Sequence, residues 1–384
     1  MAKLIEITGK VLSGEWGTDD ESGNGIPVLR TTNFTNEGIV DYSNVVTRTI
    51  QKKNIDAKYL RKGDIIIEKS GGSDKQPVGR VIYFDGPEST YLFNNFTGLL
   101  RVKNQAVWLP RYVFYSLFHN YRKGGTRPFE SKTTGLHNLK TDDYISRYEV
   151  LEAPISEQQS ICKQLDYVYD IIKTRQQQLQ KLDELVKARF VEFFGDPILN
   201  QKQFPVYRMD EVVEFQGGSQ PDKKFFEYEP TDDNIRLIQI RDYKTDKFIT
   251  YIPRAMAKRF CTADDIMIGR YGPPIFQILQ GIEGSFNVAL MKATPKKGNK
   301  EFVRQFLKQE CLLDYLEGMS KRTAGQDGIQ MDKLKAYPFP LPPVELQNQF
   351  EKFVNQVDKS KVAVQKSLDE AQLLFDSLMQ QYFG

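Results

Sequence analysis

The chain has 384 residues, of which 40% are hydrophobic and 12% aromatic, so it can bury the cores of two or three domains. Its 53 basic and 50 acidic residues leave a net charge of +3, which is too small to indicate nucleic-acid binding by itself. No basic segment with an apolar core opens the chain and no apolar run approaches membrane-spanning length, so we expect a soluble cytoplasmic protein with no membrane partner.

Cysteine and histidine are sparse. The three cysteines, Cys162, Cys261 and Cys311, are far apart in sequence. The two histidines, His119 and His137, belong to no ligand spacing such as Cys-x-x-Cys. We therefore predict neither disulfides nor a metal site.

The region before residue 154 reads as strands separated by basic loops. Residues 1–7 are strand-like, and residues 26–34 form an alternating strand that ends in a turn. A turn carrying Asp64 then leads into a buried strand within residues 60–67. Basic loops rich in Gly, Ser and Thr follow at residues 68–73, 122–127 and 131–135.

Residues 154–195 predict one long helix. Apolar side chains step by four and three along it, and neither Pro nor Gly interrupts it between its start and Gly195. A helix of this length is a rod of about 60 Å, longer than most helices inside a compact domain. The seam residues are Ile161, Leu165, Val168, Ile172, Leu179, Leu182 and Val186.

Residues 196–342 look like a diverged copy of the first region. Residues 235–243 occupy the relative place of the strand at 26–34, and residues 261–268 again place an Asp-containing turn before a buried strand. Basic loops recur at residues 269–272 and 320–326. Each region thus carries Lys and Arg, with Gly, Ser and Thr, on loops at two matching places.

Residues 343–384 repeat the heptad register of 154–195 without a gap. The seam residues of this second helix are Val354, Val357, Val364, Leu368, Phe375 and Leu378. Ordinary core helices of two α/β domains are the alternative interpretation. The repeat favours pairing, because a long heptad seam needs a similar seam as its partner and the chain has only one other.

Chain order determines how such helices would pair. The first leads away from one globular region and the second leaves from the other, so we expect them to run antiparallel. The predicted fold class is α+β, with two similar mixed α/β domains at residues 1–153 and 196–342. Helices 154–195 and 343–384 would join them as a coiled-coil spacer with pseudo-two-fold symmetry.

The basic loops have the composition of a nucleic-acid reader. Glycine allows close approach to phosphate, Ser, Thr and Lys contact phosphate, and Arg or Gln can pair with purine edges. A single such loop is more often a solvated turn, but matching pairs favour binding. The candidate contacts are Arg30, Lys69, Ser73, Lys75, Arg80, Arg122, Lys123, Arg127, Lys132, Arg241, Arg270, Tyr271, Lys321, Arg322 and Gln326.

The order of segments resembles the specificity subunit of type I restriction-modification systems, over essentially the whole chain. The proline-glutamine entry that this family has at each conserved helix matches Pro154 and Gln158, and again Pro343 and Gln347. The first helix closes with Phe-Phe-Gly-Asp-Pro and the second with Phe-Gly. The first entry departs from the family pattern, since Glu-Ala-Pro-Ile replaces Leu-Pro-Pro-Leu.

The resemblance implies a DNA-recognition subunit that is not an enzyme. Each globular region would be a target recognition domain that reads one half of a bipartite, asymmetric site in double-stranded DNA. The helices would set the spacing of the half-sites and dock two adenine methyltransferase subunits, and restriction subunits would join in the full complex.

The motifs of the chain agree with catalysis in partner chains. It lacks the Phe-x-Gly-x-Gly and Asn-Pro-Pro-Tyr patterns of adenine methyltransferases and the Gly-x-x-x-x-Gly-Lys loop for ATP, so we expect no cofactor. Two alternatives stay open. One is a coiled-coil scaffold whose end domains bind proteins, and the other is an enzyme with duplicated domains.

Overall fold

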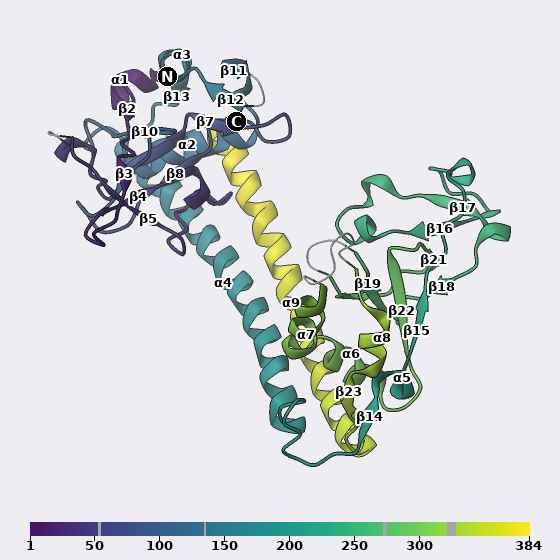
Figure 1. Ribbon diagram of the computed structural model, residues 1–384. Coiled ribbons are helices and arrows are strands. Elements are labelled where there is room, and N and C mark those ends of the chain that lie inside the picture. Colours follow the sequence, from purple (N-terminus) through teal and green to yellow (C-terminus); the bar gives the residue numbers. More distant parts are fainter. Residues whose placement is uncertain (53–54, 134–135, 272–274, 321–327) are drawn as a thin grey trace. The chain divides into compact units, whose positions relative to one another are not determined.

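The structure of the protein is a computed structural model that describes residues 1–52, 55–133, 136–271, 275–320 and 328–384. The chain packs into two compact units: residues 1–176 with 366–384 form unit 1, and residues 177–365 form unit 2. Helices α4 (Ile155–Phe194) and α9 (Val344–Phe383) are continuous, and each contributes to both units (Figure 1). Within the described ranges, no helix combines the length and apolar character needed to cross a membrane.

Unit 1 is built on two sheets, one with strand order β2–β10–β6–β8 and one with order β3–β5–β4–β9. Strands β4 and β9 run parallel, and the other neighbours in these sheets run antiparallel. The strands are β2 (Leu12–Ser13), β3 (Thr18–Asp19), β4 (Ile26–Leu29), β5 (Val46–Thr49), β6 (Ile65–Glu68), β8 (Val81–Tyr83), β9 (Leu92–Phe93) and β10 (Thr97–Leu100).

Helices and smaller sheets complete the globular part of unit 1. Strand β1 pairs with β13, and β7, β12 and β11 form a further sheet. Their bounds are β1 (Ala2–Lys3), β7 (Ser70–Gly72), β11 (Glu130–Thr133), β12 (Leu136–Leu139) and β13 (Glu149–Val150). The helices are α1 (Leu4–Thr8), α2 (Pro110–Arg122) and α3 (Thr141–Arg147), with 3-10 turns η1 (Thr31–Asn33), η2 (Asp56–Lys58) and η3 (Arg127–Phe129).

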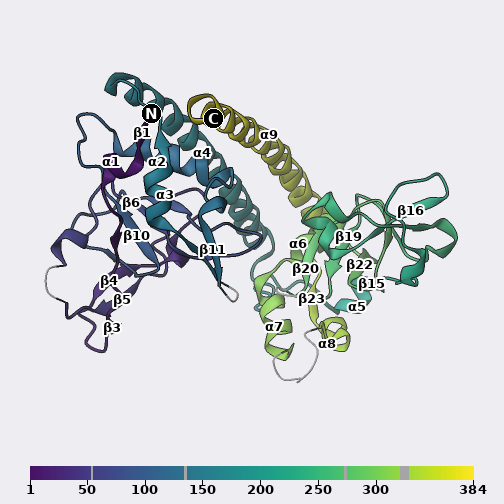
Figure 2. The same ribbon diagram turned by 90° about the horizontal axis from the view of Figure 1, so that it is seen from above.

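Strand β6 shows how the layers of unit 1 form. Ile65 and Ile67 belong to a core shared with α2 and α4, whereas Ile66 packs with Leu29 and Phe93 between the two sheets. Alternate side chains of a strand point to opposite faces, so a strand covered on both sides needs an unbroken apolar run. In Figure 2, α1, α2 and α3 lie on one side of β6 and β10, and β3, β4 and β5 lie on the other.

Unit 2 repeats the first sheet with strand order β15–β22–β19–β20 and has a small pair β14–β23 like β1–β13. Its second sheet, β17–β16–β21–β18, repeats the three strands β5–β4–β9 with their parallel pair, but its fourth strand lies at the opposite edge. The strands are β14 (Val206–Arg208), β15 (Val213–Gly217), β16 (Asn234–Ile238), β17 (Tyr251–Pro253), β18 (Phe260–Cys261), β19 (Ile266–Gly269), β20 (Gln277–Gln280), β21 (Gly284–Phe286), β22 (Leu290–Pro295) and β23 (Pro338–Pro340). The helices are α5 (Met209–Val212), α6 (Lys300–Leu307), α7 (Glu310–Ser320) and α8 (Met331–Ala336), with 3-10 turns η4 (Lys223–Phe225), η5 (Ile240–Tyr243), η6 (Asp246–Phe248) and η7 (Arg254–Met256).

The turn before strand β6 in unit 1 and the turn before strand β19 in unit 2 are closed by equivalent hydrogen bonds. Asp64 Oδ2 accepts a hydrogen bond from Arg61 N at 2.7 Å, and Asp265 Oδ2 accepts one from Thr262 N at 2.8 Å. These turns precede β6 and β19, as the sequence predicts. The duplicated Asp therefore closes a turn through its side chain.

The long helices run antiparallel where they meet in unit 1. Tyr382 Oη donates to Gln164 Oε1 at 2.9 Å, and Arg175 Nε donates to Ser367 Oγ at 3.1 Å. Residue numbers on α9 thus fall as those on α4 rise, which establishes the antiparallel direction.

The same direction holds inside unit 2. Lys361 Nζ lies 2.6 Å from Asp183 Oδ1, and the rings of Phe194 and Phe350 lie 5.2 Å apart. The uninterrupted helices predicted from the sequence are therefore confirmed, and within each unit they pair in the expected direction.

The seam residues differ in burial. Ile161, Leu165, Val168, Ile172, Val186, Val354, Val357 and Phe375 are buried, whereas Leu179, Leu182, Val364, Leu368 and Leu378 are half-buried. The heptad pattern missed Phe190 and Met379, both 1% exposed. Phe190 faces the globular part as well as α9, since its ring stacks on Phe302 at 5.7 Å and meets Phe350 at 5.6 Å.

A buried glutamine ties the start of each long helix to its globular part. Gln158 Oε1 accepts from Leu109 N at 2.9 Å, and its Nε2 donates to the carbonyls of Val107 and Ala153, both at 2.8 Å. These bonds satisfy backbone groups on both sides of the junction.

The second glutamine has the same place in unit 2. Gln347 Oε1 accepts from Asn299 N at 2.7 Å, and its Nε2 donates to Pro342 O at 2.6 Å. Gln158 and Gln347 are each 1% exposed. The proline-glutamine entry of each helix thus connects the start of that helix to its globular part through hydrogen bonds.

One local prediction, a strand over residues 1–7, is wrong beyond β1. Residues 4–8 form α1, in which Lys3 N donates to Glu6 Oε2 at 3.2 Å as in a capping box. Leu4 and Ile7 are both buried. Because they are three residues apart, a single helical turn buries both on one face.

Candidate nucleic-acid interface

The C-terminal ends of β4, β6 and β9 converge with the end of β2 in unit 1. Asn94 N, which follows β9, donates to Leu29 O of β4 at 2.9 Å, and Lys69 N, which follows β6, donates to Phe96 O at 2.8 Å. Glu15 N donates to Phe93 O at 2.8 Å. We call this group of chain ends the strand-end edge of unit 1.

Unit 2 builds the same edge with different residues. Asn287 N donates to Ile238 O at 3.0 Å, Arg270 N to Ala289 O at 2.9 Å, and Ser219 N to Phe286 O at 3.0 Å. These bonds match those of unit 1 one for one. The strand-end edge is therefore a common frame on which the two units carry different side chains.

A glycine is required at one point of each frame. A Cβ on Gly14 would lie 2.2 Å from Asn94 O, and a Cβ on Gly218 would lie 1.9 Å from Asn287 O. Real Cβ atoms do not approach oxygen this closely. Gly14 and Gly218 thus allow the chain that leaves β2 and β15 to approach the backbone of Asn94 and Asn287 closely.

Lys69 and Arg270 occupy equivalent positions, each following its central strand. Lys69 Nζ donates to Ser13 Oγ at 2.7 Å, and burial, followed by the charge of Lys58, lowers the pKa of the Lys69 amine. An amine held partly out of water beside another cation gains from an anionic partner.

Arg270 has few internal partners for its charge. Its Nη1 donates to Val288 O at 3.4 Å, and its guanidinium lies 5.3 Å from the ring centroid of Tyr271. Tyr271 itself is 46% exposed. Arg270 and Tyr271 thus form a cationic and aromatic pair at the edge of unit 2.

The pairing of residues 26–34 with 235–243 places Arg30 opposite Gln239, and the structure confirms this equivalence. Arg30 N donates to Asn33 Oδ1 at 2.9 Å before η1, and Gln239 N donates to Asp242 Oδ2 at 3.3 Å before η5. Arg30 therefore matches Gln239. Strand β16 ends at Ile238, so Arg241 lies inside η5 instead of at the strand end.

The side chains of the two arginines reflect these places. Arg30 is half-buried, and its Nη2 donates to Asn44 O at 3.4 Å. Arg241 is exposed, donates from Nη2 to Thr250 Oγ1 at 3.1 Å, and lies over the ring of Phe248.

Arg80 points inward. Its Nη1 donates to Phe34 O and its Nη2 to Thr31 O, both at 2.9 Å, and Nη2 also lies 3.5 Å from Glu68 Oε1. Burial raises the pKa of Glu68, and the Arg80 charge partly offsets that effect. The structure thus uses Arg80 to hold a loop, and leaves little of its guanidinium for a ligand.

The loop after β7 carries the exposed candidates Ser73 and Lys75. Ser73 Oγ accepts from Gln76 N at 3.1 Å, and Arg127 donates to Asp74 O at 3.5 Å. Lys132 lies in β11, paired with His137 of β12, and its side chain is outside the described part.

His137 is a residue of this loop region that the sequence did not single out. Its Nδ1 lies 2.9 Å from Glu130 Oε2 and its Nε2 lies 3.5 Å from Asp74 Oδ1. It therefore links β12 to the loop that carries Ser73 and Lys75. A histidine alone in sequence, without ligand spacing, gives no local signal for such a link.

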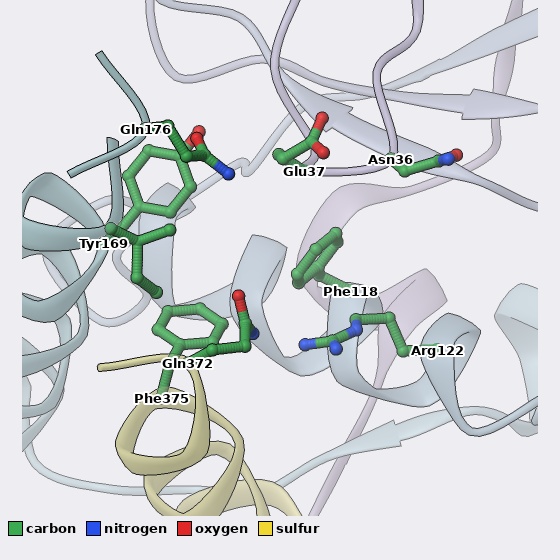
Figure 3. Close-up of a pocket in the computed structure, with 9 residues that line it drawn as sticks. Asn36, Glu37, Phe118, Arg122, Tyr169, Gln176, Gln372 and Phe375 are labelled. Atoms are coloured by element: carbon green, nitrogen blue, oxygen red, sulfur yellow. The ribbon is translucent and has the colours of Figure 1, made fainter. Parts of the chain in front are cut away.

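Arg122, at the end of α2, borders a cavity of about 260 Å³ beside α4 and α9 in unit 1 (Figure 3). Figure 3 shows its guanidinium directed into the cavity, with Phe118 above it and Gln372 facing it. Arg122 Nη1 also pairs with Asp376 Oδ1 at 2.7 Å. Arg122 thus supports helix packing although it is exposed, as is the next residue, Lys123.

The remaining candidates lie at residues that carry no structural description. Lys321, Arg322 and Gln326 are outside the described residues. Within the described ranges, no three His, Cys, Asp or Glu side chains group as metal ligands would.

Comparison with known proteins adds a family to this geometry. A family model described as the type I restriction modification DNA specificity domain matches residues 2–184 and again residues 201–371. Each match covers one globular part and much of the long helix that follows it. None of the curated proteins matches the sequence.

Solved structures share the fold over the whole chain. The S subunit of a type I restriction-modification system from M. genitalium superposes with a TM-score of 0.56 at 15% identity, covering 100% of this chain and 95% of that one. A chain from a study of complex assembly and conformational transition of the type I R-M system gives 0.53 at 16% identity, with 100% and 96% covered.

Proposed function

Because this chain belongs to the type I restriction-modification DNA specificity family, we propose that it directs such a system to its DNA sequence. The target is a bipartite, asymmetric site in double-stranded DNA, and each unit reads one half. Methylation and cleavage reside in partner chains, so this chain needs no catalytic residue and no cofactor. Its place of action is the cytoplasm.

The observation that carries this proposal is the strand-end edge, which the same backbone hydrogen bonds build twice. Lys69 and Arg270 put a cation at the same position of each edge, where phosphate contacts would orient the DNA. Neighbouring positions differ between units, as Arg30 and Gln239 do. Two units with the same backbone arrangement but different side chains are suited to recognise two different half-sites.

Helices α4 and α9 would serve as the coiled-coil spacer between half-sites and as the platform for two adenine methyltransferase subunits. Leu185 on α4 and Leu374 on α9 support this role, because both are large apolar side chains at equivalent positions of the repeat. They are 45% and 50% exposed. Restriction subunits would join through the assembled methyltransferase.

Methylation sequencing of a host that expresses this chain with its partner methyltransferase tests the proposal. We expect a bipartite adenine-methylated motif that disappears when this chain is deleted. A methylation pattern independent of this chain would contradict the proposal and favour a protein-binding scaffold.

Single substitutions then test whether the strand-end edge of each unit contacts the DNA. Lys69→Ala should weaken binding and lower the dependence of log K on log salt by about one phosphate contact. Lys62→Ala is the matched control, since Lys62 is exposed at the opposite end of β6. Arg270→Ala should weaken binding and lower the salt slope in the same way, and an unchanged affinity and slope in either variant would remove that residue from the DNA interface.

A further inference from the structure

The turn between β9 and β10 is held tightly on the strand-end edge of unit 1. Thr97 Oγ1 and Thr97 N donate to Asn94 O at 2.9 and 3.1 Å, and both residues are buried. Phe96 O accepts from Lys69 N at 2.8 Å and from Ser70 N at 3.2 Å. The backbone of the turn is therefore fixed on both sides.

The side chain of Phe96 is nevertheless 53% exposed. Leaving half of a phenyl ring in water forgoes the stabilisation that burial of apolar surface gives. Because the backbone of the turn is hydrogen-bonded on both sides, the ring is held at the surface of the strand-end edge.

The fold does not require a phenylalanine at this place. In unit 2 the equivalent turn has Leu290 N donating to Asn287 O at 3.0 Å, and the carbonyl that receives Arg270 N belongs to Ala289. Alanine therefore builds the equivalent turn with the same two backbone hydrogen bonds, from Leu290 N to Asn287 O and from Arg270 N to Ala289 O. The exposed ring of Phe96 is therefore not needed to form the strand-end edge.

The surroundings of Phe96 indicate what the ring meets. Lys69 follows β6 directly beside it, and Arg30 follows β4, whose Leu29 carbonyl anchors Asn94 at the start of the turn. Glu15, the acid of this edge, is already engaged by Lys52 at 2.8 Å and by Lys58. The strand-end edge of unit 1 thus carries an exposed apolar ring and, on neighbouring chain ends, the cations Lys69 and Arg30. This combination suits DNA, where phosphates meet cations and bases meet apolar side chains.

We propose that Phe96 is a specificity-determining residue whose ring makes an apolar contact with a base of the half-site read by unit 1. This inference rests on the proposed function. The contact is either with a thymine methyl group in the major groove or with a partly unstacked base step. Ala289 would give unit 2 a smaller apolar surface at the same point.

The test uses the full chain in complex with its methyltransferase and the DNA motif identified by methylation sequencing. Wild type, Phe96→Ala, Phe96→Leu and Lys69→Ala are compared for binding to the motif and to single-base variants of each half-site over a salt series. Melting of each variant is recorded alongside. Phe96→Ala should have the melting temperature of the wild type, because Ala289 occupies the matching turn. If Phe96→Ala lowers the melting temperature, Phe96→Leu replaces it as the test variant.

Phe96→Ala should lower discrimination at one base pair of a single half-site by about tenfold while leaving the salt slope unchanged. Replacing thymine by uracil at that position should reproduce the loss if the methyl group is the contact. If uracil has no effect, a fluorescent base analogue at that step should report unstacking with wild type and less with Phe96→Ala.

Unaltered discrimination in both Phe96 variants would overturn this inference. The proposed function would still stand if Lys69→Ala changed the salt slope in the same experiment. Failure of the proposed function has a different result, namely no motif that depends on this chain.

Discussion

Replacing Gln158 by Leu tests whether the buried glutamine joins α4 to the globular part of unit 1. The substitution leaves the Leu109 amide and the Val107 and Ala153 carbonyls without the partner that Gln158 supplies. Each buried polar group left unpaired costs about 1–3 kcal/mol, and the added leucine surface returns a part. We expect a loss of about 3–5 kcal/mol in the local free energy of opening.

Hydrogen exchange resolved by mass spectrometry suits this measurement, because two packed units need not unfold in one step. Peptides spanning residues 104–112 should lose protection in Gln158→Leu. Gln159→Leu is the control, since Gln159 is the exposed neighbour on the same helix, and it should change stability by less than about 0.5 kcal/mol. Equal protection in the two variants would refute the role of Gln158.

Three further predictions address the frame, a buried acid and the helix surface. Gly218→Ala should destabilise unit 2 by about 1–3 kcal/mol in chemical denaturation, because its Cβ would overlap Asn287 O, and unchanged stability would contradict that contact. Burial raises the pKa of Glu68, so its contribution to stability is fully present below the ordinary value of 4.5 and is lost as pH rises through the folded pKa. Relative to Glu68→Gln, the wild type should therefore lose stability as pH rises above 4.5, and a constant difference would argue against it. Leu185→Asp combined with Leu374→Asp should weaken association with the methyltransferase in calorimetry without lowering the melting temperature, whereas intact association would exclude these leucines from the interface.

Residues that lie close in sequence gave the most reliable predictions. The strands around Ile66 and Met267, their preceding Asp turns, and the helices that end at Phe194 and Phe383 are all confirmed. The first residues were harder, because Leu4 and Ile7 fit a short helix as well as a strand. Tertiary packing of both side chains into one core decided for the helix.

The roles of the cations depended on contacts between distant segments. Arg80 and Lys69 are both basic residues next to glycine-containing loops, yet Arg80 turns inward to the Phe34 and Thr31 carbonyls and Lys69 stays at the strand-end edge. Nothing near Arg80 in sequence indicates those carbonyls, because they belong to the turn after β4. The partners of such side chains can be identified only in the folded structure.

The sequence by itself determined the duplication, the two uninterrupted helices and the family of the chain. Heptad periodicity, proline-free segments and entry motifs are local properties, so they survive without coordinates. The pairing of residues 26–34 with 235–243 in the sequence already made Arg30 correspond to Gln239, whereas only the tertiary structure decided that Phe96 corresponds to Ala289. This second equivalence arises where strands far apart in the chain end side by side, and the backbone hydrogen bonds that define it leave no trace in residue type.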